Sequence, residues 1–196
     1  MQELDSLLEL LLMLVKEPRT GILLILLVIA SFSDYATYKI PNWLTFGGML
    51  FGLTYNAAVP LSTNPHHAFL WAAQGLLIGL CIMLPLYVMK IMGAGDVKLM
   101  AMIGAFLGAS DTLYVILFSF IIGGIAAIGF AIANQALTRM LVNIKNISQI
   151  FILTATSGFK PEATIEKEQS VGKLPYGICI SIGATLYLIT RQLSYI

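Results

Sequence analysis

Long apolar stretches separated by short polar connections make up most of this chain. Six of them approach the roughly 20 residues that a helix needs to cross a membrane. They carry few or no charged side chains and cover residues 18–37, 41–59, 68–89, 92–110, 112–137 and 174–190. Glycines four residues apart, Gly75 with Gly79 and Gly104 with Gly108, would allow helices to approach closely. The pattern predicts an all-α membrane protein, a polytopic bundle of about six transmembrane helices.

Two segments depart from this pattern. Residues 1–17 contain an apolar run that is too short to span a membrane, which predicts either a surface segment or an extension of the first helix. Between Met140 and Phe151, apolar positions recur at steps of three or four with polar residues between them. This pattern predicts an amphipathic interfacial helix within a long cytoplasmic loop, residues 138–173. We expect residues 1–196 to form a single membrane domain.

The composition supports this class and excludes others. Of the 196 residues, 58% are hydrophobic and 11% are charged, whereas a soluble domain carries about 25% charged residues. The net charge is +1 and no basic cluster is present, so we expect membrane lipid and no nucleic acid as a partner. Cys81 and Cys179 form no Cys-x-x-Cys pair, which favours packing roles over a metal site.

The distribution of basic residues predicts the orientation. Eight of the 11 lysines and arginines fall in or beside the loops that follow the first, third and fifth stretches, and three fall elsewhere. Basic loops remain in the cytoplasm, so these odd-numbered loops are expected there. Both chain termini would then face the opposite side.

Two aspartates interrupt the apolar stretches. Asp34 lies in the first stretch and Asp96 in the fourth, and a carboxylate at such a place is costly, so each is a candidate functional residue. Only 14 residues separate Arg19 from Asp34, and 14 separate Asp96 from Asp111. Both aspartates should therefore lie at one depth, near the cytoplasmic ends of their helices. Two such carboxylates could form a dyad that activates water, the chemistry of an aspartyl protease.

The residues around Asp96 are further candidates. Gly93 and Gly95 permit unusual backbone angles and the close approach of another chain, although a flexible loop before a helix has the same pattern. Lys98 lies two residues beyond the aspartate. It could favour the charged form of Asp96, or it could extend to the lipid phosphates, which we slightly prefer.

Two helix starts on the same side are also candidates. Pro41 and Asn42 open the second stretch, where a proline at the first helical turn is a sufficient explanation. Pro175, Tyr176 and Gly177 open the last stretch, where proline again suits a helix start and an aromatic residue suits the interface. This last segment could line an active site.

Three segments, taken in order, resemble the type IV prepilin leader peptidases, which are GxGD-type membrane aspartyl proteases. They are Asp34 followed by Ile40-Pro41-Asn42, then Gly93-Ala94-Gly95-Asp96-Val97-Lys98-Leu99, then Leu174-Pro175-Tyr176-Gly177. The resemblance implies that Asp34 and Asp96 are the catalytic pair and that no metal or cofactor is needed. It also implies cleavage of the basic leader of a prepilin or pseudopilin, just after a glycine, at the cytoplasmic face of a prokaryotic inner membrane.

The chain resembles the short, Flp/Tad-type form of this family. The long members carry a cysteine-rich cytoplasmic segment linked to N-methylation of the mature pilin, and the sequence has no such segment. The resemblance therefore implies peptidase activity for type IV pilus biogenesis without N-methyltransferase activity.

Two other functions fit some of the same features. Presenilin-like or signal-peptide-peptidase-like proteases share the Gly-x-Gly-Asp element, but they have more spans, and a tyrosine precedes their first aspartate, whereas Tyr35 follows Asp34. A proton- or cation-coupled transporter also uses paired intramembrane acids. Transporters usually show repeated halves with broken helices, and no convincing repeat is visible here. A peptidase assay with a model prepilin discriminates among the three.

Overall fold

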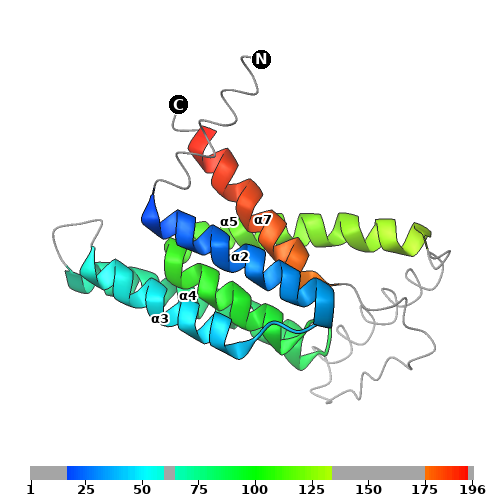
Figure 1. The fold of residues 1–196 in the computed structure, drawn as a ribbon, viewed down its shortest axis with the longest axis horizontal. Helices are drawn as coiled ribbons and strands as arrows, with labels where there is room; N and C mark the ends of the chain where they lie inside the picture. The colour runs from blue at the N-terminus through cyan, green and yellow to red at the C-terminus, as the bar shows by residue number, and fades with distance from the viewer. Residues whose placement is uncertain (1–16, 60–64, 134–174, 194–196) are drawn as a thin grey trace, which may run out of the picture. The chain divides into compact units, whose positions relative to one another are not determined.

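The computed structural model describes residues 17–59, 65–133 and 175–193 (Figure 1), and within these ranges the chain forms helices and no strands. The elements are α2 (Pro18–Thr37), α3 (Asn42–Ala58), α4 (Pro65–Val88), α5 (Ala94–Ala133) and α7 (Tyr176–Leu193). The prediction of an all-α protein is confirmed for these residues. The predicted amphipathic helix within 138–173 lies outside them, as does the N-terminal segment apart from Glu17.

The chain divides into two compact units. The first comprises Met1–Gly123 and Pro175–Ile196, and it holds α2, α3, α4, the larger part of α5 and α7. The second is Gly124–Leu174, of which the described residues 124–133 continue α5. All the candidate site residues belong to the first unit.

Prolines mark the starts of α2 and α3, and a residue in the left-handed conformation follows the end of α2. Pro18 stands at the start of α2, where its missing N–H leaves no helical hydrogen bond unmade. The helix ends at Thr37, and its C-cap residue Tyr38 has φ 52° and donates its N–H to the Asp34 carbonyl oxygen at 2.9 Å. Pro41 is the N-cap residue of α3. The predicted limits of the first stretch, residues 18–37, are confirmed.

The fourth and fifth predicted stretches form one element, α5, with a sharp break inside it. The break lies at Gly108, which has φ 79° and ψ 179°, three residues before the predicted break at Asp111. A positive φ favours glycine, and the ring of Trp71 occupies the position that a Cβ would take. Residues before and after Gly108 run in clearly different directions (Figure 1).

Glycines bring α4 and α5 into backbone contact. A Cβ on Gly75 would collide with the carbonyl oxygen of Gly104, and a Cβ on Gly104 would collide with that of Gly75. One turn away, a Cβ on Gly79 would lie 2.7 Å from the Met100 carbonyl oxygen. The close approach predicted from the four-residue spacing is confirmed. The other helices of the unit pack in pairs, α3 on α4, α2 on α7 and α2 on α3.

Three of the described helices are long and apolar enough to cross a membrane. They are Pro18–Thr37, His67–Val88 and Ala94–Ala133, and the last of these covers most of the fourth and fifth predicted stretches. Large apolar side chains remain exposed along these helices, for example Val28, Phe32 and Leu77. A soluble monomer rarely exposes long continuous apolar surfaces, so the fold fits a membrane protein.

Alanine at Gly104 should destabilise the protein, because the added methyl group would overlap with the backbone of Gly75. Overpacking of this kind costs about 1–3 kcal/mol. Gly47 is the matched control: it is an exposed glycine inside α3, and a Cβ there would have no atom within 4 Å. Alanine at Gly47 should stabilise the helix by about 0.5–1 kcal/mol. Thermal unfolding of detergent-solubilised protein measures both changes, and equal stability of the two variants would contradict the contact between α4 and α5.

Candidate active site

The start of α7 holds Asp34, which lies in the last turn of α2 and is 5% exposed. The Gly177 N–H donates a hydrogen bond to Asp34 Oδ2 at 2.8 Å. The first amides of a helix have no partner within the helix and carry the positive end of its dipole. The N-terminus of α7 therefore satisfies and stabilises a negative charge on Asp34.

Asp96 is held by the start of its own helix. It is the third residue of α5 and is 7% exposed. Its Oδ2 accepts a hydrogen bond from the Gly93 N–H at 3.0 Å, while its own N–H donates to the Gly93 carbonyl at 3.1 Å. An acidic side chain that reaches back from the third helical position to the N-cap amide is half of a capping box. This local structure fixes the direction of the carboxylate.

Ile40 connects the surroundings of the two aspartates. A Cβ on Gly95, next to Asp96, would lie 3.3 Å from Ile40 Cβ. A Cβ on Gly177, the hydrogen-bond partner of Asp34, would lie 3.0 Å from Ile40 Cδ1. The carboxylates of Asp34 and Asp96 lie close enough to interact electrostatically. The structure thus brings the two aspartates to one end of the first unit, as expected from their common depth.

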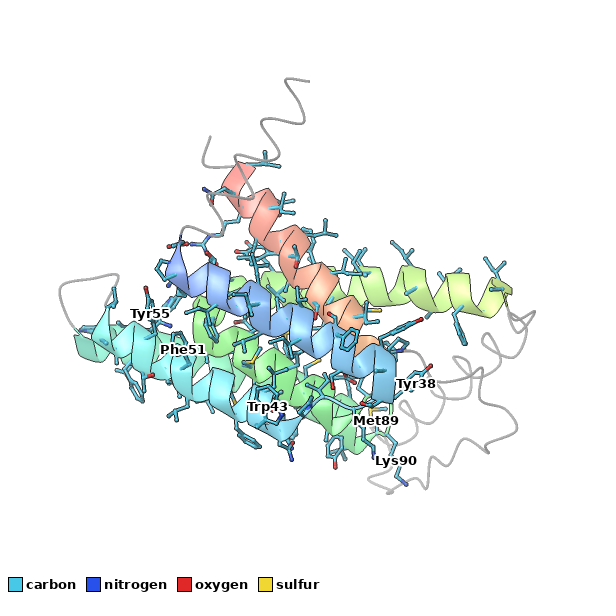
Figure 2. All side chains as sticks on the ribbon, in the orientation of Figure 1. Tyr38, Trp43, Phe51, Tyr55, Met89 and Lys90 are labelled. Atoms are coloured by element: carbon cyan, nitrogen blue, oxygen red, sulfur yellow. The ribbon has the colours of Figure 1, made fainter. Side chains whose placement is uncertain are left out.

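The ends of several helices gather at this site. Tyr38 follows α2, and Met89 and Lys90 follow α4; Figure 2 shows these residues together at one end, with Phe51 and Tyr55 toward the other end of α3. Lys90 adopts a left-handed conformation with φ 58°, which ends α4 and turns the chain toward Gly93.

Lys98 joins α5 to the start of α3. Its ammonium group donates to Asn42 Oδ1 at 2.8 Å and lies 5.1 Å from the centroid of the Phe46 ring. The ammonium group is therefore directed to Asn42. Its extension to lipid phosphates, preferred from the sequence, stays a prediction. Two of the predicted motifs, the one around Asp96 and the one at Pro41 and Asn42, are in direct contact through this hydrogen bond.

The last motif, residues 175–177, supplies more than a helix start. A Cβ on Gly123 would lie 3.7 Å from the Tyr176 ring, so Tyr176 packs on α5. The Tyr176 hydroxyl interacts electrostatically with Asp96, and the buried Cys179 thiol interacts with both aspartates. The sequence predicted only packing for Cys179 and assigned no role to Ile40. Their proximity to the aspartates depends on lateral packing, for which the sequence carries no signal.

The arrangement suits acid–base chemistry. Two buried carboxylates interact, and each accepts a hydrogen bond from a backbone N–H group. A carboxylate pair that carries one proton can act as a base toward water and as an acid toward a carbonyl oxygen.

Comparison with known protein families gives a match over the part of the chain that holds both aspartates. The model of the Type IV leader peptidase family matches residues 21–128, which is more than half of the chain. The matched region contains Asp34, Asp96 and the contact between Lys98 and Asn42, while residues 175–177 lie beyond it. Neither the curated proteins nor the solved structures gave a match.

The hydrogen bond between Lys98 and Asn42 should be measurable as a coupling energy. Lys98→Met and Asn42→Ala each remove it, so their combined effect on the free energy of unfolding should fall short of additivity by about 0.5–1 kcal/mol. Lys90→Met combined with Asn42→Ala is the control, because the exposed Lys90 follows α4 and, within the described residues, only Lys98 donates a side-chain hydrogen bond to Asn42. Chemical unfolding in detergent gives the four free energies of each cycle. Additive effects of Lys98→Met and Asn42→Ala would contradict the contact.

Proposed function

We propose, because the chain belongs to the type IV leader peptidase family, that it is a GxGD-class aspartyl endopeptidase that removes the leader of prepilin-like proteins. In this proposal Asp34 and Asp96 are the catalytic pair. The observation that supports it most is the meeting of two buried, interacting carboxylates at one end of an apolar helical unit. Family membership favours this function over the presenilin-like protease and the transporter.

The proposed reaction uses one proton shared by the two carboxylates. The ionised carboxylate takes a proton from a bound water, and the protonated one donates to the oxygen of the scissile carbonyl. The water oxygen bonds to the carbonyl carbon, and the C–N bond of the resulting tetrahedral intermediate breaks as its nitrogen is protonated. Both carboxylates cannot readily ionise together at close range, so the singly protonated pair is the active form.

The backbone hydrogen bonds would orient the pair for this reaction. The amides of Gly177 and Gly93 hold one oxygen each of Asp34 and Asp96, at 2.8 and 3.0 Å. Reacting groups that are already in position avoid the entropic cost of bringing them together.

In the membrane, we propose six crossing segments: α2, α3, α4, the two parts of α5 on either side of Gly108, and α7. The distribution of basic residues would place the aspartates at the cytoplasmic face of a prokaryotic inner membrane. The substrate would be a prepilin or pseudopilin, as in a Flp/Tad-like type IV pilus system. Its apolar segment would lie among the helices and its basic leader would remain in the cytoplasm. We propose leader cleavage without N-methylation.

Asp34→Asn and Asp96→Asn should each lower the rate of leader removal by about 10²- to 10⁴-fold, because an amide can neither accept nor donate the required proton. Purified protein in detergent with a model prepilin and gel-based detection of the cleaved product measures this rate. Asp111→Asn is the control: Asp111 pairs with Arg191 in the last turn of α7, at the opposite end of that helix from Gly177. This variant should retain cleavage. Substantial cleavage by Asp34→Asn or Asp96→Asn would reject the proposed catalytic pair.

The proposed orientation predicts which residues an impermeant thiol reagent can reach. In a background with Cys81→Ala and Cys179→Ala, cysteines at the exposed positions Lys39 and Lys90 should react only in inverted vesicles. A cysteine at the exposed Val59, at the other end of α3, should react in intact cells. Mass spectrometry of the labelled protein quantifies both. Reaction of positions 39 and 90 from opposite sides would place the ends of α2 and α4 on different faces and contradict a shared site.

A further inference from the structure

We propose that Ile40 is a spacer that sets the separation of the Asp34 and Asp96 carboxylates and is therefore a positioning residue for the peptidase reaction. This inference rests on the proposed function. It assigns a role to a residue that takes no part in the proposed chemistry but packs between the backbone segments that carry and hold the two carboxylates.

Ile40 fills the space between two glycines. It is 8% exposed. Its Cβ is the atom nearest to the open position on Gly95, and its Cδ1 lies 3.0 Å from the open position on Gly177. Gly95 precedes Asp96, and the Gly177 amide bonds Asp34. The width of this side chain therefore sets how near the start of α5 can come to the start of α7. A β-branched side chain suits this role because its χ1 angle is stiff.

The backbone on both sides of Ile40 is anchored. The Lys39 carbonyl accepts hydrogen bonds from Ser33 Oγ at 2.9 Å and from Thr37 Oγ1 at 3.2 Å. On the other side, Asn42 accepts the hydrogen bond from Lys98 at 2.8 Å. The connector between α2 and α3 is thus tied to α2 at one end and to α5 at the other. A spacer must be held in this way, because a mobile side chain would not fix a distance.

The separation of the carboxylates matters because their repulsion rises as they approach. A closer pair shares one proton over a wider pH interval, and a more distant pair over a narrower one. The described titratable groups that interact with the pair are Tyr176 and Cys179 of α7. Lys98 of α5 is engaged by Asn42. A substitution at Ile40 removes none of these titratable groups. Its effect on the pH profile would therefore reflect a change in the distance between the Asp34 and Asp96 carboxylates.

Ile40→Val removes Cδ1, the atom that faces Gly177, and lets the two segments approach. We expect kcat to fall by up to about tenfold, since small misplacements of reacting groups are costly, while KM changes little. We also expect the pH interval between the two half-maximal rates to widen. Ile103→Val is the matched control: it deletes the same methyl group from a fully buried isoleucine on α5, seven residues beyond Asp96. It should lower thermal stability and leave the pH interval unchanged.

A second measurement needs no substrate. Gly177→Ala places a methyl group 3.0 Å from Ile40 Cδ1 and 2.8 Å from Asp34 Oδ2, so it should lower the thermal stability. Adding Ile40→Val removes the first of these contacts and should restore part of the loss, whereas adding Ile103→Val should not. The spacer role of Ile40 would be rejected by an unchanged or narrower pH interval in Ile40→Val. It would also be rejected if adding Ile40→Val to Gly177→Ala restored none of the lost thermal stability. Absence of leader cleavage by the wild-type protein would instead reject the proposed function, which the stability cycle does not test.

Discussion

The hydrogen bond from the Gly177 amide to the Asp34 carboxylate joins residues 143 positions apart, and the candidate site depends on it. A buried carboxylate without a partner is costly, so α2 keeps Asp34 inside the fold only if α7 begins beside it. Packing of α2 on α7 provides that arrangement. The requirement also explains why residue 177 is a glycine: a side chain there would meet both Asp34 and Ile40. The hydrogen bond that gives the buried Asp34 carboxylate a partner therefore also sets the position of α7.

Among the described residues, backbone amides donate hydrogen bonds to both aspartates, and no basic side chain forms an ion pair with either of them. An arginine or lysine beside one carboxylate would favour a fixed negative charge on it and weaken proton exchange within the pair. Amides stabilise the carboxylates without titrating, so in the proposed mechanism they would leave a shared proton free to move between the two aspartates. The nearest basic residue in the motif, Lys98, is engaged by Asn42 and the Phe46 ring. The hydrogen bond between Lys98 and Asn42 therefore both joins α5 to α3 and directs a cation to a neutral partner.

Sequence patterns predicted the positions of structure along the chain better than the contacts across it. The limits of the first apolar stretch predicted both ends of α2 correctly. The depth argument predicted that Asp34 and Asp96 lie at the same end of the unit. The break in α5 was predicted at Asp111, because a charged residue marks the end of an apolar stretch. It occurs at Gly108, where Trp71 excludes a side chain and the backbone needs a positive φ. The partners of Asp34, and the places of Ile40 and Cys179, follow from lateral packing, which depth along a helix does not determine.

Glycine has two distinct functions in this unit, and the difference lies in what faces it. Gly75 and Gly104 face each other's backbone, which cannot move aside as a flexible side chain can. Their contact therefore fixes the distance between α4 and α5. Gly95 and Gly177 face the side chain of Ile40, whose size evolution can change one methyl group at a time. The spacing of the aspartates is therefore separable from the packing of the bundle. If the pair is catalytic, substitution at position 40 can tune its proton sharing while Asp34, Asp96 and the backbone groups that hold them stay unchanged.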